Sequence, residues 1–398
     1  MDKVVSFTVE GRTYSPPPVP IVGICIDGCA DEYLSTAIAH GRMPRFLEMT
    51  RRGWRGMARA CLPTFTNVNN CAIVTGTPPS RTGMVGNYIL NPATGEEVMT
   101  NSSSWLRNQT LLAAAAHSGR TVAMVTAKDK LREMLSKGLP EGHIAFSSEK
   151  APGWAEALVG PKPPIYSGDA SLYVLRAGVK LIEERRSDFL YLSLTDYMQH
   201  TYAPDDPESI AFYAEIDGCL GQLLGLGARV GITADHGMNG KPNILYLESE
   251  LTARFGSGVR VICPITDPYV VHHGALGSAV TVYIDDVLRA AEIAEFVLAH
   301  PGVSEVHDRA TASAKLDLPA ELIGDLYVLS GRDWVIGRTP EHHDLAQLDG
   351  DLRSHGGRYE EMVPFAFSHP LLPDHRARAL GDPRNFDLFD FLCNGLDA

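Results

Sequence analysis

Short runs of apolar, mostly β-branched residues recur along the chain, and each run ends at polar residues. These runs are Ile21–Ile26, Thr121–Thr126, Phe189–Leu194 and Arg229–Thr233. Uninterrupted apolar runs of this length are typical of strands buried on both faces, as in a parallel sheet. The stretches between them have the periodicity of helices, and the predicted helices are Asp31–Ala39, Pro44–Arg52, Thr110–Ser118, Ser171–Arg186 and Ile210–Leu224. Strands that alternate with helices predict βαβ units and therefore an α/β fold.

The pattern changes between about residues 245 and 342. A strand, a helix and two further strands are predicted there, at Ala279–Ile284, Val287–His300, Val303–His307 and Leu326–Leu329. We interpret residues 245–342 as a small inserted α+β cap domain. Residues 1–244 and 343–398 then form the α/β core, which ends with a last apolar strand at Val363–Phe367.

Composition and charge limit the partners that the chain can have. The 398 residues are enough for two domains, and 35 Lys and Arg against 48 Asp and Glu give a formal net charge of −13. This balance argues against nucleic acid or an anionic membrane as a partner, so a small anionic ligand would need a locally positive site. The seven cysteines lack the spacing of a disulfide framework, and no signal peptide or membrane-spanning run is visible. We therefore expect a cytoplasmic protein with reduced thiols, and whether it forms a homo-oligomer stays open.

Polar residues with metal-binding chemistry follow several of the predicted strands. Asp27 follows the first, Asp196 the third, and Asp235 the fourth. Sites in open α/β sheets form beyond the carboxyl ends of the strands, which favours a shared site. An aspartate at a strand end can also simply cap the next helix, and for any one strand that alternative stays open.

Histidines near these aspartates complete a candidate ligand set. Asp196 and His200 are four residues apart, so on a helix they share one face, although a surface ion pair has the same spacing. His236 follows Asp235 directly, and Gly237 permits the turn that would let both side chains converge. The whole set is Asp27, Asp196, His200, Asp235, His236 and His355. Six such ligands suffice for two divalent ions, an arrangement suited to in-line displacement at phosphorus.

A threonine in Leu62-Pro63-Thr64-Phe65-Thr66-Asn67 supplies a candidate nucleophile. We assign this role to Thr64, because a hydroxyl at a loop-to-helix junction lies near helix N–H groups that can receive phosphoryl oxygen. The alternative is that Thr64 or Thr66 is only a helix N-cap.

Taken in order, these motifs resemble those of the alkaline phosphatase superfamily, in its nucleotide pyrophosphatase/phosphodiesterase-like branch. The resemblance implies a three-layer α/β/α sandwich and two Zn²⁺ ions per chain. It implies that one ion is held by Asp196, His200 and His355, and the other by Asp27, Asp235, His236 and the Thr64 oxygen. It also implies that Asn87 binds the phosphoryl group.

Within that branch the chain most resembles the phosphonoacetate hydrolase family. The matching segments are residues 62–70, 125–131, 165–169, 267–274 and 352–357. The resemblance implies that Lys128 and Lys130 bind the substrate carboxylate, although a solvated Lys-x-Lys pair is the common alternative. The implied reaction hydrolyses the C–P bond of phosphonoacetate to acetate and phosphate through a phosphothreonine, with the cap domain excluding water and bulky diesters.

Three other interpretations were weighed. Cys61-Leu62-Pro63-Thr64-Phe65 resembles the sulfatase nucleophile element, but Phe65 replaces the arginine of that element. A phosphodiesterase or phosphomonoesterase with the same metals stays open, as does a non-catalytic zinc-binding protein. No role is assigned to the paired histidines at 272–273 and 342–343.

Overall fold

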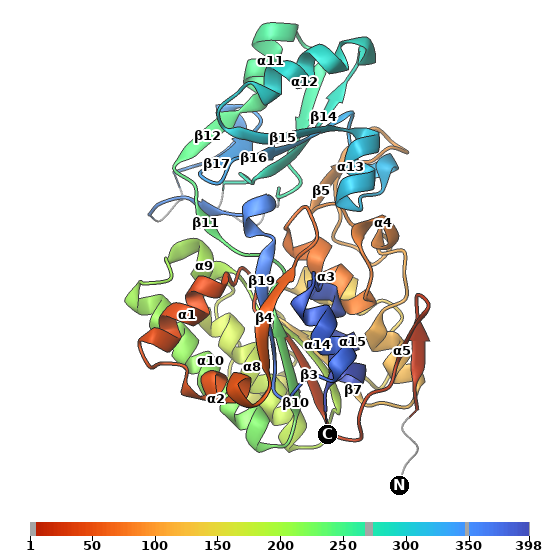
Figure 1. Cartoon of the computed structure of the whole chain (residues 1–398), viewed down its shortest axis with the longest axis vertical. Helices are drawn as coiled ribbons and strands as arrows, with labels where there is room; N and C mark the ends of the chain where they lie inside the picture. The colour runs from red at the N-terminus through yellow and green to blue at the C-terminus, as the bar shows by residue number, and fades with distance from the viewer. Residues whose placement is uncertain (1–4, 267–273, 347–349, 398) are drawn as a thin grey trace.

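A seven-stranded sheet forms the centre of the large unit of the protein (Figure 1). The computed structural model describes residues 5–266, 274–346 and 350–397. The strand order across the sheet is β4 (Trp54–Arg59), β19 (Met362–Phe367), β10 (Arg229–Thr233), β3 (Ile21–Cys25), β9 (Phe189–Ser193), β7 (Val122–Thr126) and β8 (Ile144–Ser147). From β10 to β8 all neighbours are parallel, whereas β19 is antiparallel to both of its neighbours.

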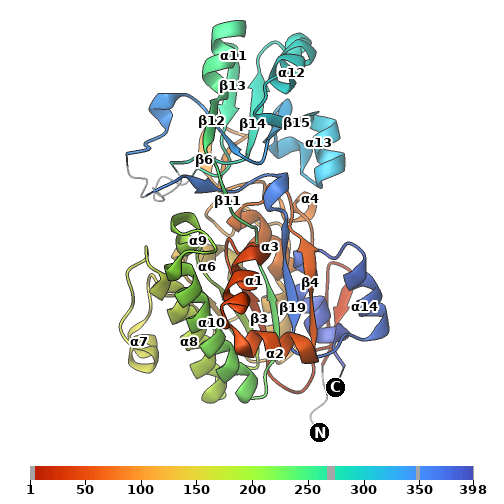
Figure 2. The same ribbon diagram turned by 60° about the vertical axis from the view of Figure 1, so that its left-hand side comes forward.

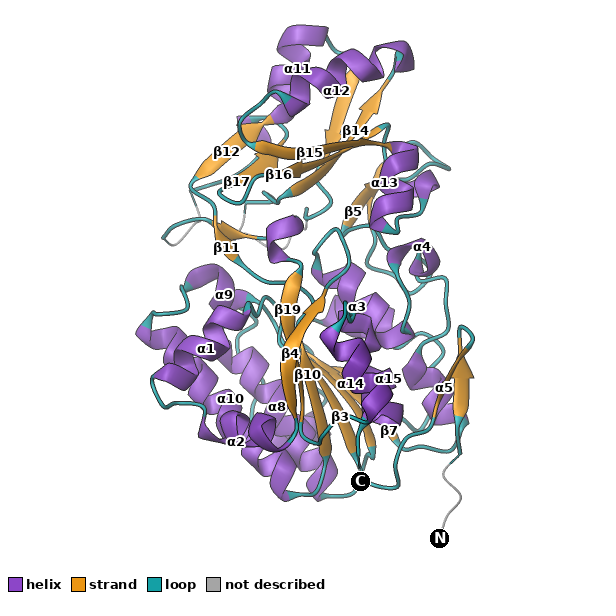
Figure 3. Ribbon diagram, in the orientation of Figure 1, coloured by secondary structure: helices purple, strands orange, loops and turns teal. Residues whose placement is uncertain are grey.

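Helices cover both faces of this sheet, as Figure 3 shows. One face carries α1 (Asp31–Ala39), α2 (Pro44–Arg52), α7 (Gly153–Val159), α8 (Gly168–Glu183) and α10 (Pro207–Gly225). The other carries α3 (Thr66–Thr75), α5 (Leu111–His117), α6 (Asp129–Leu135), α14 (Pro373–Leu380) and α15 (Leu388–Asp390). The predicted α/β/α sandwich is therefore confirmed. Central strands such as β7 and β9 are buried along their whole length, which explains their continuous apolar runs.

Close packing against the sheet demands small residues at some points. A side chain at Gly23 in β3 would place its Cβ 2.9 Å from the ring of Phe389 in α15. The bare backbone of Gly23 therefore lets α15 lie directly on the sheet.

The small unit comprises a second sheet and its helices, between about residues 243 and 337 (Figure 2). Its antiparallel strands are ordered β13 (Val259–Ile262), β14 (Ala279–Ile284), β16 (Leu326–Ser330) and β15 (Val303–Asp308). Its helices are α11 (Leu247–Phe255), α12 (Ala290–Leu298) and α13 (Arg309–Leu316). The predicted β-α-β-β string is incomplete, because α13 stands between β15 and β16. This helix buries only Ala312 and Leu316, so it has no clear apolar period.

Short paired strands lie near the junction between the two units (Figure 1). β11 (Asn239–Gly240) pairs with β18 (Arg353–Ser354), and β12 (Asn243–Tyr246) pairs with β17 (Trp334–Gly337). A hairpin of β5 (Tyr88–Leu90) and β6 (Glu97–Met99) packs against the small unit although it precedes it by far in the sequence. The boundaries at 245 and 342 stay a prediction, because segments from outside this range also pack with the small unit.

The remaining elements are short. They are the hairpin of β1 (Phe7–Val9) and β2 (Arg12–Tyr14), the short helices α4 (Pro79–Thr82) and α9 (Tyr197–Thr201), and several single turns. All seven cysteines are buried and free of disulfides, as expected. Among the described residues, no helix has the length and hydropathy needed to cross a membrane.

Candidate metal centre and cavity

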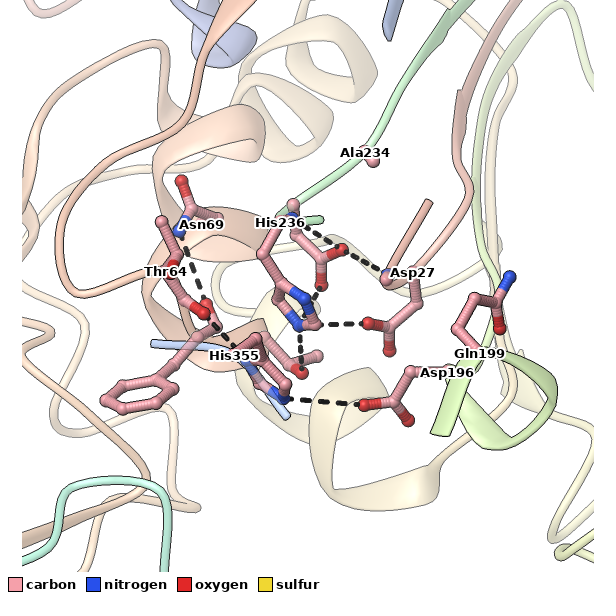
Figure 4. Close-up of polar contacts among 12 residues, drawn as sticks. Asp27, Thr64, Asn69, Asp196, Gln199, Ala234, His236 and His355 are labelled. Carbon is pink, nitrogen blue, oxygen red and sulfur yellow. Dashed lines mark hydrogen bonds and ion pairs between the residues drawn. The ribbon is translucent and has the colours of Figure 1, made fainter. Parts of the chain in front are cut away.

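Three buried aspartates meet at the carboxyl ends of neighbouring parallel strands. Asp27 follows β3, Asp196 follows β9, and Asp235 follows β10. Because β3 lies between β9 and β10, the three side chains converge at one edge of the sheet, where Figure 4 shows Asp27 and Asp196. Their exposed fractions are 0%, 3% and 0%, so three carboxylates share one water-poor site.

Two groups of side chains at this edge have the composition and spacing of metal sites. Asp196, His236 and His355 form one group, and Asp27, Asp235 and His236 form the other. Within each group the candidate ligand atoms lie within 4.8 Å of one another. His236 belongs to both groups, with its Nε2 3.2 Å from Asp27 Oδ1 (Figure 4). The structure thus brings these five predicted ligands together.

His200 and His355 are held by bonds to backbone carbonyls. In His200, Nδ1 donates to the carbonyl of Arg353 at 2.7 Å, and Nε2 faces Asp196 Oδ2 at 3.1 Å. In His355, Nδ1 donates to the carbonyl of Thr64 at 2.7 Å, and Nε2 lies 3.9 Å from the same Asp196 oxygen. A histidine that donates through one nitrogen presents the other as a metal ligand, which is the usual arrangement around zinc. His200, the sixth predicted ligand, is therefore at the cluster as well.

The electrostatics of the cluster fit divalent cations. Burial raises the pKa of Asp27 well above its usual range, and the neighbouring Asp196 and Asp235 raise it further. Burial also raises the pKa of Asp235 to about 6. The Oδ2 of Asp27 is buried without a hydrogen-bond partner among the described residues, and its Oδ1 faces His236 Nε2 at 3.2 Å. A buried carboxylate with so few partners is costly unless it coordinates metal, so the donor set fits a binuclear site.

The predicted nucleophile Thr64 faces away from this cluster. Its hydroxyl donates to the carbonyl of Gly357 at 3.1 Å and accepts from the amide of Gly356 at 3.0 Å. Thr66, at the first turn of α3, instead lies with its Oγ1 3.4 Å from His236 Nε2. The geometry therefore favours Thr66 over Thr64 as the hydroxyl that faces the candidate ligands. The sequence offered both hydroxyls near the helix start, but only the path of the backbone decides which one faces the ligands.

An asparagine that the sequence analysis missed supports the second metal group. Asn70 of α3 donates through Nδ2 to Asp235 Oδ2 at 3.0 Å. Its own Oδ1 accepts from the hydroxyls of Tyr191 and Ser193, at 2.7 and 2.8 Å. The two consecutive asparagines in an otherwise apolar helix were the available signal, since a fully buried amide needs specific partners.

A cavity of about 450 Å³ opens onto the cluster. Its wall combines metal-site residues, a lysine-rich stretch and apolar side chains from both units. The lining residues are Thr66, Asn67, Asn87, Met99, Asn101, Lys128, Asp129, Lys130, Leu131, Glu149, Lys150, Ile165, Tyr166, Asp196, Ile265 and His355. Thr64 is not among the described residues that line it. Lys150 and the apolar wall had not been predicted from the sequence.

Three of the four predicted substrate-binding residues, Asn87, Lys128 and Lys130, lie on this wall, whereas Thr64 does not. Lys128 and Lys130 are at the first turn of α6, directly beyond β7, and Lys128 Nζ lies 2.9 Å from Asp196 Oδ1. Asn87 reaches the cavity from the segment before β5, where its backbone N–H donates to the Pro264 carbonyl at 2.7 Å. The cavity therefore brings Lys128 and Lys130 beside the candidate metal ligands Asp196 and His355.

Of the histidines without an assigned role, 272 and 273 lie outside the described residues. His343 is buried in the small unit, where Nδ1 donates to the carbonyl of Gly274 and Nε2 accepts from the amide of Arg338. These bonds use both of its nitrogens, so His343 has a structural role. His342 is at the surface beside Thr339.

The family model for type I phosphodiesterase/nucleotide pyrophosphatase matches residues 21–358, which is most of the chain. The chain belongs to this family. The expected branch of the alkaline phosphatase superfamily and the expectation that the chain is an enzyme are thereby confirmed.

Solved structures extend the comparison. The phosphonoacetate hydrolase of Sinorhizobium meliloti 1021, in complexes with phosphonoacetate and with phosphonoformate, is 43% identical to this chain, with a TM-score of 0.92. Each match covers 98% of this chain and 99% of that one. Murine ectonucleotide pyrophosphatase/phosphodiesterase 5 is 15% identical, with a TM-score of 0.64 over 94% of both chains. This second likeness shows the shared fold.

Proposed function

We propose that this enzyme hydrolyses the C–P bond of phosphonoacetate to acetate and phosphate. The observation that carries the proposal is one cavity lined by Lys128, Lys130, Thr66 and the metal ligands Asp196 and His355. A substrate with a phosphonate at one end and a carboxylate at the other matches this division of the wall. The similarity to a phosphonoacetate hydrolase that binds such ligands supports the same substrate.

Two zinc ions are the cofactors that best fit the cluster. Imidazole and carboxylate ligands within 4.8 Å of one another favour Zn²⁺ over Mg²⁺ or Ca²⁺, which prefer oxygen ligands alone. Asp196, His200 and His355 would hold one ion, and Asp27, Asp235, His236 and the Thr66 oxygen the other. When bound, the ions lower the pKa of a ligated hydroxyl or water and neutralise charge on the phosphonate oxygens.

Thr66 supplies the nucleophile in this proposal. Its oxygen forms a bond to phosphorus in line with the C–P bond, which breaks, and the electron pair leaves with carbon as the enolate of acetate. The proton that the Thr66 hydroxyl gives up, relayed through water, converts the enolate to acetate. A second water then attacks the phosphothreonine and releases phosphate. The first turn of α3 places backbone N–H groups beside Thr66, where they can receive a phosphoryl oxygen.

Lys128 and Lys130 stabilise the leaving group. A carbanion is tolerable only if its charge spreads into the carboxylate, and ammonium groups beside that carboxylate act where the charge develops. They also create a locally positive wall inside a protein whose formal net charge is −13, so a small anion can enter.

A substrate panel tests the proposal. We expect the zinc-loaded enzyme to release phosphate from phosphonoacetate with a higher kcat/KM than from an aryl phosphate monoester or diester. Preference for the diester would overturn the proposal in favour of a phosphodiesterase. Failure to release phosphate from any of the substrates, with two zinc ions bound, would favour a non-catalytic zinc-binding protein.

A further inference from the structure

A lysine and a glutamate form a fully enclosed ion pair at the junction between the two units. Lys241 Nζ lies 2.8 Å from Glu360 Oε1, and both side chains have an exposed fraction of 0%. Lysine and glutamate are almost never fully buried unless they are paired, and burying a pair is costly. Hydrophobic residues of similar size would fill such a space as well, so the charges need a reason other than stability.

The carboxylate of Glu360 accepts hydrogen bonds from two loops, the one that follows His236 and the one that follows His355. Its Oε1 accepts from Asn239 Nδ2 at 2.7 Å as well as from Lys241, and its Oε2 accepts from the amide of Gly357 at 3.1 Å. Its backbone carbonyl accepts from the amide of Gly237 at 2.8 Å. Gly237 directly follows His236, and Gly357 is two residues after His355. One residue therefore binds the backbone next to a histidine ligand of each loop.

Lys241 connects this point to the small unit. Its Nζ also donates to the carbonyl of Arg332, in the turn between β16 and β17. Its backbone N–H donates to the Leu352 carbonyl, which extends by one residue the β11–β18 pairing that precedes His355. Figure 1 shows β11 at the junction between the two sheets.

Only a carboxylate satisfies every donor at this position. Three N–H donors, from Lys241, Asn239 and Gly357, converge on the two side-chain oxygens of Glu360. A glutamine has one acceptor oxygen, so its NH₂ group would face at least one of these donors. The Glu360→Gln substitution therefore breaks a bond while keeping size and shape.

We propose that Lys241 and Glu360 are a positioning pair that fixes the loops of His236 and His355 relative to each other and to the small unit. The pair acts through the backbone beside the ligands, and neither residue lines the cavity or belongs to the metal groups. The inference rests on the proposed metal site, and it does not depend on which substrate the enzyme uses.

The test compares Glu360→Gln with the matched control Glu248→Gln. Glu248 likewise binds one backbone amide, that of Val261 at 2.7 Å, and one cation, Arg338 at 3.1 Å, but it lies in the small unit away from the cluster. We expect Glu360→Gln to weaken zinc affinity by about 10- to 100-fold, as loss of a ligand-orienting contact does. In the metal-free protein, hydrogen exchange should become faster in residues 234–241 and 353–360.

Kinetics with saturating zinc complete the test. We expect kcat of Glu360→Gln to fall while KM changes little, and Glu248→Gln to keep the zinc affinity and exchange rates of the parent. A lower Tm in both variants with equal zinc affinity and equal exchange in those loops would overturn the proposal. If Glu360→Gln does not fold, the double variant K241M/E360Q also removes the lysine charge that the single substitution leaves buried and unpaired. The same measurements on the double variant then decide whether the pair positions the two loops. Failure of the parent enzyme to cleave phosphonoacetate would contradict the proposed function but leave the zinc and exchange measurements valid.

Discussion

The hydroxyl oxygen of Thr66 lies 3.4 Å from Nε2 of His236, on the side of α3 that faces the buried aspartates. Thr64, two residues earlier, has its hydroxyl bound to the backbone of Gly356 and Gly357. Thr66 is therefore the hydroxyl that faces the candidate metal ligands, whereas Thr64 bonds to the loop that carries His355.

Substitution of each threonine separates these functions. We expect Thr66→Ala to lose about 10³-fold or more in kcat, because it removes the nucleophile, while its zinc content stays at that of the parent enzyme. Thr64→Val should lose less, up to about 100-fold, because it only loosens the His355 loop. Rapid-quench mass spectrometry should find the phosphorylated residue at position 66 in Thr64→Val. Near-parental turnover in Thr66→Ala would refute the assignment.

The pattern of apolar residues was sufficient to predict several helices and strands of the large unit. Helices α1 and α2 begin and end where predicted, and strand β10 matches its predicted bounds, because burial on both faces leaves a continuous apolar run. Strand β4 was missed, since Trp54-Arg-Gly-Met-Ala-Arg59 lies at the sheet edge and carries two arginines inside it or at its end. Edge strands commonly carry such charges, so a continuous apolar run does not mark them in the sequence.

The candidate site was predictable where chemistry alone identifies residues. Buried aspartates and histidines after strands point to metal whatever the loop geometry is. The choice between Thr64 and Thr66 depends on the path of the backbone in one turn. Because both residues are threonines, residue type alone does not tell which hydroxyl faces the ligands. Asn70 and Glu360 act through contacts across 165 and 119 residues of sequence, which no local pattern reports.

Asn70 provides a test of the support behind Asp235. We expect Asn70→Leu, which has a similar volume, to lower zinc affinity by about 10- to 100-fold, because Asp235 Oδ2 loses its donor at 3.0 Å. Tyr191→Phe is the matched control, since Asn70 then keeps its bond from Ser193. Chelator competition measures both affinities. Equal affinity in Asn70→Leu and the parent would contradict a ligand-orienting role.

Lys130 tests the carboxylate clamp more cleanly than Lys128, which also contacts the metal ligand Asp196. We expect Lys130→Met to raise KM and lower kcat for phosphonoacetate, with kcat/KM falling about 10- to 100-fold, because charge on the leaving enolate is less stabilised. Activity toward an aryl phosphate ester, which has no carboxylate, should change little. Lys180→Met is the control, because Lys180 pairs with Glu183 on the exposed side of α8. Equal losses of Lys130→Met on both substrates would refute the clamp.

Removal of metal should destabilise the folded state as well as stop turnover. Binding to the native state alone stabilises it by about 2.7 kcal/mol when free zinc is 100 times its Kd. We therefore expect chelation to lower Tm and added zinc to restore it, with two ions bound per chain at saturation. Thr66→Ala should show nearly the same shift in Tm, because most ligands remain. An unchanged Tm in the metal-free protein would argue against zinc at the three buried aspartates.

A second ion pair between the units makes a prediction about pH. Arg358, three residues after His355, donates to both carboxylate oxygens of Glu305 in β15, at 2.8 and 2.9 Å. This contact lowers the pKa of Glu305 to about 2. A carboxylate whose pKa is lower in the folded state adds stability above its unfolded pKa of about 4.3 and loses it as pH falls through the folded value.

Thermal unfolding of the metal-free protein and of its Glu305→Gln variant checks this sign. The parent should have the higher Tm at neutral pH, and the difference should stay constant down to about pH 5 and then shrink as pH falls toward the lowered pKa of Glu305. Glu48→Gln, which removes an exposed pair with Arg52, should change Tm little at any pH. A Tm difference for Glu305→Gln that persists unchanged well below pH 4 would contradict a contribution from charge, because a protonated Glu305 resembles glutamine in shape and in its loss of the ion pair.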